Sequence, residues 1–202
     1  LLPDVAGGRL KPERARMSLP DYLARRRVNF VEKEVARLDT ETREAFMADG
    51  SVLGYEFLVL APGSRTNFFG MQDVARNSLK LDHVEDARRI CQAVLAQPQK
   101  NIFVIGGGYT GIEVATHVAI LLRRRGVRSY RLHVVEKADD ILSSLPVWMQ
   151  DYARLELCRL KIQTHTNSSV TAFSEDELKL SDGRVFEHPL VIWAAGVTMP
   201  AF

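Results

Sequence analysis

The sequence of 202 residues has room for one large domain or two small ones, and its 46% of hydrophobic residues suffice to fill their cores. Because 27 basic residues oppose 25 acidic ones, the net charge of +2 excludes a global attraction to nucleic acid or to an anionic membrane. No apolar run approaches a membrane-spanning length, and the first residues lack the pattern of a signal peptide. We therefore expect a cytoplasmic globular protein and, because it begins at Leu1 rather than Met, a piece of a longer chain.

The first element signal along the chain is the pair Asp49-Gly50 between two short stretches of strand-forming residues. Such a pair is typical of a β-hairpin, because both residues tolerate the backbone angles of a tight hairpin turn.

The apolar run at 57–60, which precedes Ala61-Pro62-Gly63, predicts a buried strand. A helix is expected from about residue 84 to residue 97, and the break at 97–99 predicts a domain boundary.

From residue 98 onward, strand and helix patterns alternate. The predicted order is a strand, a helix, a strand, a helix, a strand, an antiparallel meander and a last buried strand, over 101–106, 110–125, 130–136, 146–159, 161–166, the stretch around Asp182-Gly183, and 190–194. Alternation of this kind indicates a parallel sheet with right-handed crossovers. The fold class is therefore predicted as α/β, with a Rossmann-like parallel sheet and a β-meander.

The two Asp-Gly pairs belong to a longer repeat. Gly183 minus Gly50 is 133, and Gly196 minus Gly63 is also 133, so a hairpin and a glycine-terminated apolar run recur at one spacing. This recurrence indicates an internal duplication, in which only the second copy has a complete βαβ pattern before its hairpin. We therefore predict a partial FAD-binding domain over 1–97, an NAD(H)-binding domain over 98–198, and the start of a return to the first domain over 199–202.

A Gly-rich turn joins the strand predicted over 101–106 to the helix that follows. In Gly106-Gly107-Gly108-Tyr109-Thr110-Gly111, the three motif glycines permit the sharp turn, the approach of a pyrophosphate, and close packing of the helix on the sheet, in that order. The helix N-terminus adds free N–H groups that attract phosphates. The alternative is a tight connection that binds nothing.

A carboxylate follows the next predicted strand, as a dinucleotide site requires. Glu136 lies 25 residues after Gly111, since 136 minus 111 is 25. A carboxylate there accepts hydrogen bonds from the adenosine ribose and repels a 2′-phosphate, so NAD is favoured over NADP. Lys137 beside it weakens that preference, and a surface Glu136 without a ligand is the alternative.

Other chemically active residues carry less specific signals. Glu113 lies four residues before His117 in the helix that follows the Gly-rich turn, which indicates either a local Glu–His pair or a role of Glu113 near the nicotinamide. Cys91 and Cys158 lie far apart, without Cys-x-x-Cys spacing or a nearby histidine pattern. Neither a dithiol centre nor a metal site is expected.

Three segments together resemble the flavoproteins that have two dinucleotide-binding domains: YEFLVLAPGS at 55–64, IGGGYTGIEVA at 105–115 and VIWAAGV at 191–197. Within that superfamily, GSRTNFFG at 63–70 looks like the type II NADH dehydrogenases, the single-subunit NADH:quinone oxidoreductases. In those proteins the NAD domain is inserted into the FAD domain, and hydride passes from NADH to FAD and on to a quinone.

Carried over by position, the resemblance implies two sets of cofactor contacts and no catalytic side chain, because the cofactors carry the reactivity. The NADH contacts would be Gly106, Gly107, Gly108, Tyr109, Thr110, Gly111, Glu113, Glu136 and Gly196. The FAD contacts would be Val35, Ala61, Pro62 and Gly63. Pro62 stands where the family usually has Thr, which removes a hydroxyl and an N–H group.

The family's N-terminal FAD fingerprint, later flavin motif, quinone site and membrane-anchoring C-terminal helices are not in these residues. We therefore expect that the full-length parent binds FAD, reduces a quinone and lies peripherally on the cytoplasmic face of the inner membrane, whereas this piece binds NADH. A homodimer is left open. The rival interpretations are a sulfide:quinone or ferredoxin-type reductase of the same superfamily, and a module that binds NADH without turnover.

Overall fold

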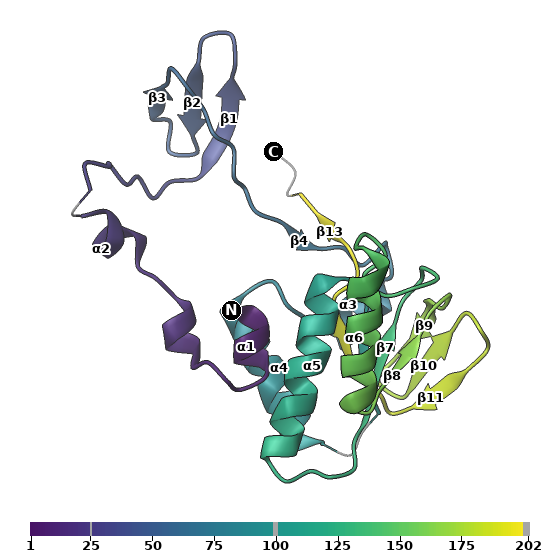
Figure 1. The fold of residues 1–202 in the computed structure, drawn as a ribbon. Coiled ribbons are helices and arrows are strands. Elements are labelled where there is room, and N and C mark those ends of the chain that lie inside the picture. The colour runs from purple at the N-terminus through teal and green to yellow at the C-terminus, as the bar shows by residue number, and fades with distance from the viewer. Residues whose placement is uncertain (25, 99–100, 200–202) are drawn as a thin grey trace. The chain divides into compact units, whose positions relative to one another are not determined.

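The computed structural model describes residues 1–24, 26–98 and 101–199, which form two compact units (Figure 1). The larger unit comprises Leu1–Arg16 and Thr66–Thr198, and the smaller unit comprises Met17–Arg65 together with Met199. This grouping joins residues 1–16 and 66–97 to the Gly-rich turn, whereas the sequence-based division placed them in the partial first domain. Part of the break predicted at 97–99 and most of the segment 199–202 lie outside the described residues.

A five-stranded parallel sheet forms the centre of the larger unit. Its strand order is β5 (Leu79–Lys80), β12 (Leu190–Trp193), β6 (Asn101–Ile105), β7 (Arg131–Val135) and β8 (Ile162–His165). The inner strands are apolar along almost their whole length, because both of their faces are covered. The α/β fold with a Rossmann-like parallel sheet is thus confirmed.

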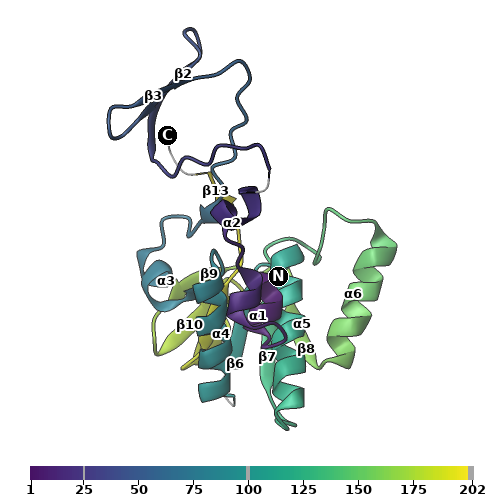
Figure 2. The same cartoon turned by 90° about the vertical axis from the view of Figure 1, so that its left-hand side faces the viewer.

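Helices cover one face of this sheet and a meander covers the other (Figure 2). On the helical face lie α1 (Leu2–Ala6), α4 (Val84–Ala96) and α5 (Tyr109–Arg124), while α6 (Val147–Arg159) packs near β8. The opposite face packs against α3 (Gln72–Asn77) and the antiparallel strands β9 (Val170–Phe173), β10 (Glu177–Leu180) and β11 (Val185–Glu187). A short 3-10 helix, Pro12–Ala15, and the two-residue strands β4 (Arg65–Thr66) and β13 (Val197–Thr198) complete the described elements around this core.

The central helix α5 forms because its apolar residues recur on one face. Val114, Val118 and Leu122 follow one another at intervals of four and are fully buried against the sheet. Gly126, with φ +77°, lies just beyond the last turn and ends the helix in the left-handed conformation.

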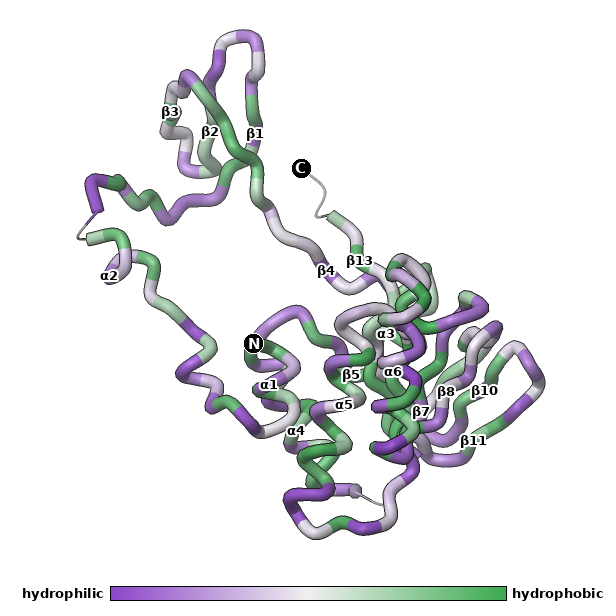
Figure 3. The backbone as a smooth tube through the Cα atoms, in the orientation of Figure 1, coloured by the Kyte–Doolittle hydropathy of each residue, from purple (hydrophilic) through white to green (hydrophobic). Residues whose placement is uncertain are grey.

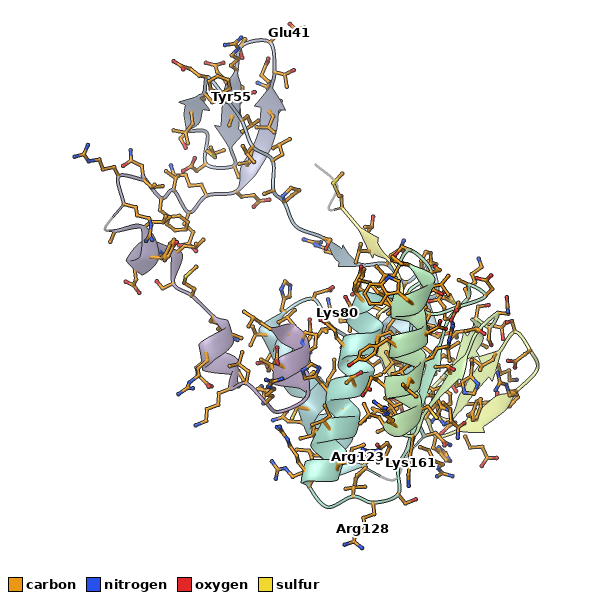
Figure 4. The ribbon with its side chains drawn as sticks, viewed as in Figure 1. Glu41, Tyr55, Lys80, Arg123, Arg128 and Lys161 are labelled. Atoms are coloured by element: carbon orange, nitrogen blue, oxygen red, sulfur yellow. The ribbon has the colours of Figure 1, made fainter. Side chains whose placement is uncertain are left out.

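The basic end of α5 lies at the edge of the sheet away from the Gly-rich turn, where Figure 4 labels Arg123, Arg128 and Lys161. Arg123 donates from Nη2 to the carbonyl oxygen of Arg159 at 2.6 Å and from Nε to the hydroxyl of Tyr130 at 3.1 Å. These bonds hold a cation where the helix dipole favours one, so Arg123 has a structural role.

The smaller unit contains α2 (Leu19–Leu23) and the antiparallel sheet β1 (Val35–Asp39), β2 (Glu44–Met47) and β3 (Val52–Gly54). Figure 4 labels Glu41 and Tyr55 in this unit. The hydroxyl of Tyr55 donates to the carbonyl oxygen of Asp39 at 3.1 Å, and the Asp39 carboxylate accepts from the backbone of Glu41 at 3.1 Å. These bonds tie the β1–β2 turn to the end of β3.

The hairpin of the smaller unit repeats in the larger one at the spacing of the sequence. Adding 133 to the bounds of β2 and β3 gives 177–180 and 185–187, the bounds of β10 and β11, and the paired residues match one for one. Gly50 and Gly183 share φ +86°, and Gly63 and Gly196 have φ +75° and +74°. The structure thus supports the internal duplication.

The buried strand predicted at 57–60 is wrong. These residues form no strand, and the side chains of Phe57 and Val59 are 90% and 88% exposed. Their counterpart 133 residues later is β12, which pairs with β5 on one side and β6 on the other. No described strand pairs with 57–60, so this hydrophobic segment (Figure 3) lacks the neighbours that would bury it.

Among the described residues, no helix is both long and apolar enough to cross a lipid bilayer. Those residues also include no cluster of three or more His, Cys, Asp or Glu side chains that could hold a metal ion.

Candidate functional site

A cavity of about 570 Å³ lies in the larger unit at the edge where the parallel strands end. Because β12, β6 and β7 are neighbours and run in the same direction, the residues after each of them meet at this edge. Its lining comes from these strand ends and from two further segments: Ile105, Gly106, Gly108, Val135, Glu136, Lys137, Ser168, Ser169, Val170, Trp193, Ala194, Ala195 and Gly196, with Phe69 and Met71. In open α/β sheets, ligands bind in the crevice beyond the carboxyl ends of the strands.

The Gly-rich turn is shaped by close backbone contacts. Gly106 has φ +108°, and a Cβ atom there would lie 2.9 Å from the carbonyl carbon and oxygen of Ala194. A Cβ atom at Gly111 would lie only 1.9 Å from the carbonyl oxygen of Gly106. Side chains are therefore excluded at both positions, and the helix can begin directly against the end of β6.

Gly108 differs from these two glycines. A Cβ atom there would meet nothing within 4 Å, and the residue lines the cavity. Its backbone is extended, with φ −76° and ψ −175°, so no conformational strain demands glycine. The free space in front of Gly108 is the feature that a diphosphate approaching the backbone would use.

The N-terminus of α5 faces this turn without a capping side chain. Gly108 is the N-cap residue, and no side-chain hydrogen bond satisfies the N–H groups of the first turn. These groups have no partner within a helix and carry a partial positive charge. Tyr109 and Thr110 are exposed at this end. The glycine cradle and the uncapped helix together fit an anionic diphosphate.

Glu136 connects the end of β7 to the Gly-rich turn. Its Oε2 accepts a hydrogen bond from the N–H of Gly107 at 2.6 Å, and its Oε1 accepts one from the N–H of Ala138 at 2.8 Å. A Cβ atom at Gly107 would lie 2.9 Å from the Cβ of Glu136, so this approach also requires a glycine. The carboxylate is thus fixed at the cavity wall, next to Lys137.

The sequence left two alternatives for Glu113, and in the structure the local contact with His117 forms through the backbone of Glu113 rather than through its side chain. His117 Nδ1 lies 2.8 Å from the backbone carbonyl oxygen of Glu113, and its Nε2 lies 3.2 Å from Oδ1 of Asp4 in α1. Glu113 is exposed and is not among the residues that line the cavity. His117 therefore anchors α1 to α5, a contact across 113 residues.

A buried histidine pair lies within the sheet next to the meander. His133 Nδ1 lies 3.0 Å from His165 Nε2, and the ring of His133 stacks on Phe103 with 4.4 Å between centroids. Burial, together with the nearby His165, Arg131 and Arg184, lowers the pKa of His133 to about 4. Burial and Arg184 also lower the pKa of His165. Since neither ring lines the cavity, we assign the pair to the core.

A family model described as "Pyridine nucleotide-disulphide oxidoreductase" matches residues 11–201. The chain belongs to the pyridine nucleotide-disulphide oxidoreductase family. The "External alternative NAD(P)H-ubiquinone oxidoreductase B2, mitochondrial" of Arabidopsis thaliana is 26% identical over 235 residues, which cover 98% of this chain and 40% of the relative. The "Demethylphylloquinone reductase NdbB" of Synechocystis is 26% identical and is covered over 46% of its length, against 89% of this chain.

Solved structures show the same fold. NDH2 from Plasmodium falciparum in complex with NADH has a TM-score of 0.82 at 20% identity, over 99% of this chain and 48% of that one. The sulfide:quinone oxidoreductase from Aquifex aeolicus has a TM-score of 0.81 at 19% identity, over 100% of this chain and 49% of that one. The chain thus spans less than half the length of these relatives.

In this member of the pyridine nucleotide-disulphide oxidoreductase family, the smaller unit holds a second cavity of about 550 Å³. Val35, Ala61 and Pro62 line it, together with apolar residues of β1, β2 and the segment 58–60, whereas Gly63 does not. The sequence contains the Gly-x-Gly-x-x-Gly pattern only once, at 106–111. The smaller unit therefore offers apolar walls but no diphosphate cradle, and its described residues do not by themselves fit a complete FAD.

Several lining residues of this family member carry no motif that the sequence would reveal. Phe69, Met71, Ser168 and Ser169 reach the cavity from connecting segments, and Trp193 reaches it from β12. The resemblance of 63–70 and 191–197 to the family's sequences covered Phe69 and Trp193, whereas no signal in the sequence marked Met71, Ser168 and Ser169. Their positions depend on contacts between segments far apart in the chain, which local patterns do not encode.

Proposed function

We propose that the chain binds NADH along the carboxyl edge of its parallel sheet and serves, within a larger flavoprotein, as the NADH-binding part of an NADH:quinone oxidoreductase. The observation that carries the proposal is the open space in front of Gly108, where a Cβ atom would meet nothing within 4 Å. That space adjoins a cavity, an uncapped helix N-terminus and the carboxylate of Glu136. A tight connection without a ligand would require none of these three features.

The strand order orients the dinucleotide in this proposal. Along the edge, the end of β12 comes first, then β6 with the Gly-rich turn, then β7 with Glu136. With the diphosphate at Gly108 and the adenosine ribose at Glu136, the nicotinamide half falls at the end of β12, where Gly196 lies. Tyr109, Thr110 and Gly111 belong to the helix start that faces the phosphates.

The protein residues bind and orient, while the cofactors supply the reactivity. Bound NADH would supply a hydride, and a flavin held by the full-length protein would accept it. We assign the NADH side to the larger unit and the flavin side to the smaller unit. The quinone acceptor is part of the proposal because the relatives' names specify ubiquinone and demethylphylloquinone. A peripheral place at the membrane is included because such quinones are lipid-soluble.

Direct titration of the 202-residue chain with NADH tests the binding step. Trp193 lines the cavity, so bound NADH should quench its emission and gain fluorescence by energy transfer. ADP-ribose, which retains the adenosine and the diphosphate, should compete. A chain that binds neither ligand would rule out the proposed site, and one that prefers NADPH would remove Glu136 from its proposed role.

A module that binds NADH without turnover is the second candidate. It is supported by the single Gly-x-Gly-x-x-Gly pattern and by the absence of a diphosphate cradle from the described part of the smaller unit. The visible absorbance of the purified chain, mixed with excess FAD and separated from free cofactor, decides between the two. Retained flavin that NADH bleaches supports an oxidoreductase, whereas a colourless chain that still binds NADH supports the module.

The rival sulfide:quinone and ferredoxin-type reductases receive no specific support from the two cysteines. Cys91 is half-buried in α4 and Cys158 is exposed on α6. Neither lines the cavity at the Gly-rich turn or the one in the smaller unit. Burial raises the pKa of the Cys91 thiol, which opposes a reactive thiolate.

A further inference from the structure

The segment Asn67–Met71, here called the strap, is fastened to the end of β12. The backbone N–H of Asn67 donates to the carbonyl oxygen of Gly196 at 3.2 Å. The indole Nε1 of Trp193 donates to the carbonyl oxygens of Asn67 and Ala195, each at 2.9 Å. Because Trp193 is only 3% exposed, this shared hydrogen bond is shielded from water and fixes the strap against the strand end.

Two consecutive phenylalanines in the strap have different surroundings. Phe68 packs towards the core, with its ring centroid 6.1 Å from that of Trp193. Phe69 lines the cavity and remains 61% exposed. The aromatic ring that core packing requires is therefore Phe68, and core packing does not account for Phe69.

The backbone holds Phe69 in an uncommon conformation. Its φ of +50° lies in the left-handed region, which bulky side chains rarely adopt. The Asn67 carboxamide oxygen accepts the N–H of Phe69 at 2.8 Å and supports this turn. At Gly196, a Cβ atom would lie 2.6 Å from Phe69 Cζ, so the glycine leaves room for the ring. Strained residues of this kind cluster at ligand-binding sites.

The polarity of the cavity changes from one end to the other. The end near β7 and β8 presents Glu136, Lys137, Ser168 and Ser169 beside Val135 and Val170, whereas the end near β12 presents no charged side chain but Phe69, Met71, Trp193 and the backbone of 194–196. A polar end suits the hydroxyls of adenosine ribose. An aromatic and apolar end suits a flat, uncharged dihydronicotinamide ring and keeps water from it.

We propose that Phe69 is a binding residue for the nicotinamide ring, against which its aromatic side chain packs at the β12 end of the cavity. The inference rests on the proposed NADH site and adds to it the residue that holds the reacting half of the dinucleotide. Asn67 and Trp193 are positioning residues, because their hydrogen bonds hold Phe69 at this end of the cavity.

The experiment compares NADH with ADP-ribose, which lacks the nicotinamide, by calorimetric titration of the 202-residue chain and of Phe69→Ala. The substitution should weaken NADH binding by about three- to tenfold, the scale of one aromatic contact, and leave ADP-ribose binding within about twofold. Phe69→Leu should give an intermediate loss. Tyr152→Ala is the matched control, since Tyr152 on α6 is 63% exposed and does not line the cavity.

Each outcome either supports or contradicts the role of Phe69. An equal loss for both ligands would place Phe69 away from the nicotinamide and overturn the inference, and so would unchanged affinity for NADH. Retained ADP-ribose binding in the variant shows that the site is still folded. If the unaltered chain binds ADP-ribose as tightly as NADH, the inference fails while the dinucleotide site stands. If it binds neither ligand, the proposed function fails together with the inference.

Discussion

The Oε2 atom of Glu136 lies 2.6 Å from the amide nitrogen of Gly107, so one carboxylate joins the end of β7 to the Gly-rich turn. Its second oxygen accepts the N–H of Ala138. Glu136 therefore has two roles in the proposed site: it holds the turn in shape, and it presents negative charge to the ribose. Substitutions that keep or remove these roles separately can distinguish them.

Glu136→Ala removes both roles. We expect NADH binding to weaken by about 1–2 kcal/mol, the scale of a charge-assisted hydrogen bond, and the preference for NADH over NADPH to narrow. Glu136→Gln keeps an oxygen acceptor for Gly107 but loses the charge. It should narrow the preference for NADH over NADPH, with a smaller loss of NADH affinity than Glu136→Ala causes. Parallel titrations with the two nucleotides measure both effects. An unchanged NADH/NADPH ratio in both variants would contradict the ribose role.

Gly108→Val fills the space assigned to the diphosphate. The extended backbone of Gly108 accepts a valine, so the thermal midpoint should stay close to that of the unaltered chain. Binding of NADH and of ADP-ribose should weaken by about 1–3 kcal/mol, the usual cost of forcing extra atoms into an occupied space. Gly54→Val in β3 is the control, because a Cβ atom there also meets nothing within 4 Å. Equal affinities for both variants would show that no ligand approaches Gly108.

Much of the larger unit could be predicted from the sequence because its elements alternate regularly. The helices predicted over 110–125 and 146–159 are observed as α5 (Tyr109–Arg124) and α6 (Val147–Arg159), and the strand predicted over 190–194 is observed as β12 (Leu190–Trp193). The glycine positions identified the turn, since Gly106 and Gly111 lie too close to neighbouring backbone atoms for a side chain. The Gly106–Gly111 turn and Glu136 indeed meet at one edge of the sheet.

The remaining features depend on contacts that local patterns do not contain. His117 pairs with Asp4, 113 residues away, where a helical spacing had suggested Glu113. Phe69 reaches the cavity only because Trp193 and Gly196 bind the strap. The Trp193–Asn67 hydrogen bond joins residues that are 126 positions apart in the chain. An apolar run such as 57–60 shows that a residue is hydrophobic, but not whether neighbouring strands exist to bury it.

The buried His133 makes stability depend on pH. Its pKa is 6.5 in the unfolded chain and about 4 in the folded one. Below pH 6.5 the unfolded state takes up the proton first, so the free energy of unfolding falls as the pH drops towards 4 and levels off below that value. Between about pH 7.5 and about pH 5 the expected loss is about 2 kcal/mol, measured by urea unfolding. The lowered pKa of His165 adds to it in the same direction.

His133→Phe tests this origin of the pH dependence. A phenyl ring can stack on Phe103 and cannot be protonated, so the loss of stability between these two pH values should shrink to what His165 alone contributes. Asp49 and Asp182 do not obscure the effect, because Lys33 and Arg184 hold the pKa values of these two carboxyl groups far below this window. An unaltered pH dependence in His133→Phe would show that other groups are responsible.

The duplication supplies a matched pair for the last prediction, since Val59 plus 133 is Ile192. In β12, Ile192 is fully buried between the strands and helices, so Ile192→Ala should lower the free energy of unfolding by about 2–5 kcal/mol. Val59 occupies the matching position in a run without neighbouring strands and is 88% exposed, so Val59→Ala should change it by less than about 0.5 kcal/mol. Denaturant unfolding of both variants makes the comparison. A cost at Val59 similar to that at Ile192 would mean that residues 57–60 are buried in a strand after all, which would overturn the structural difference between the two copies.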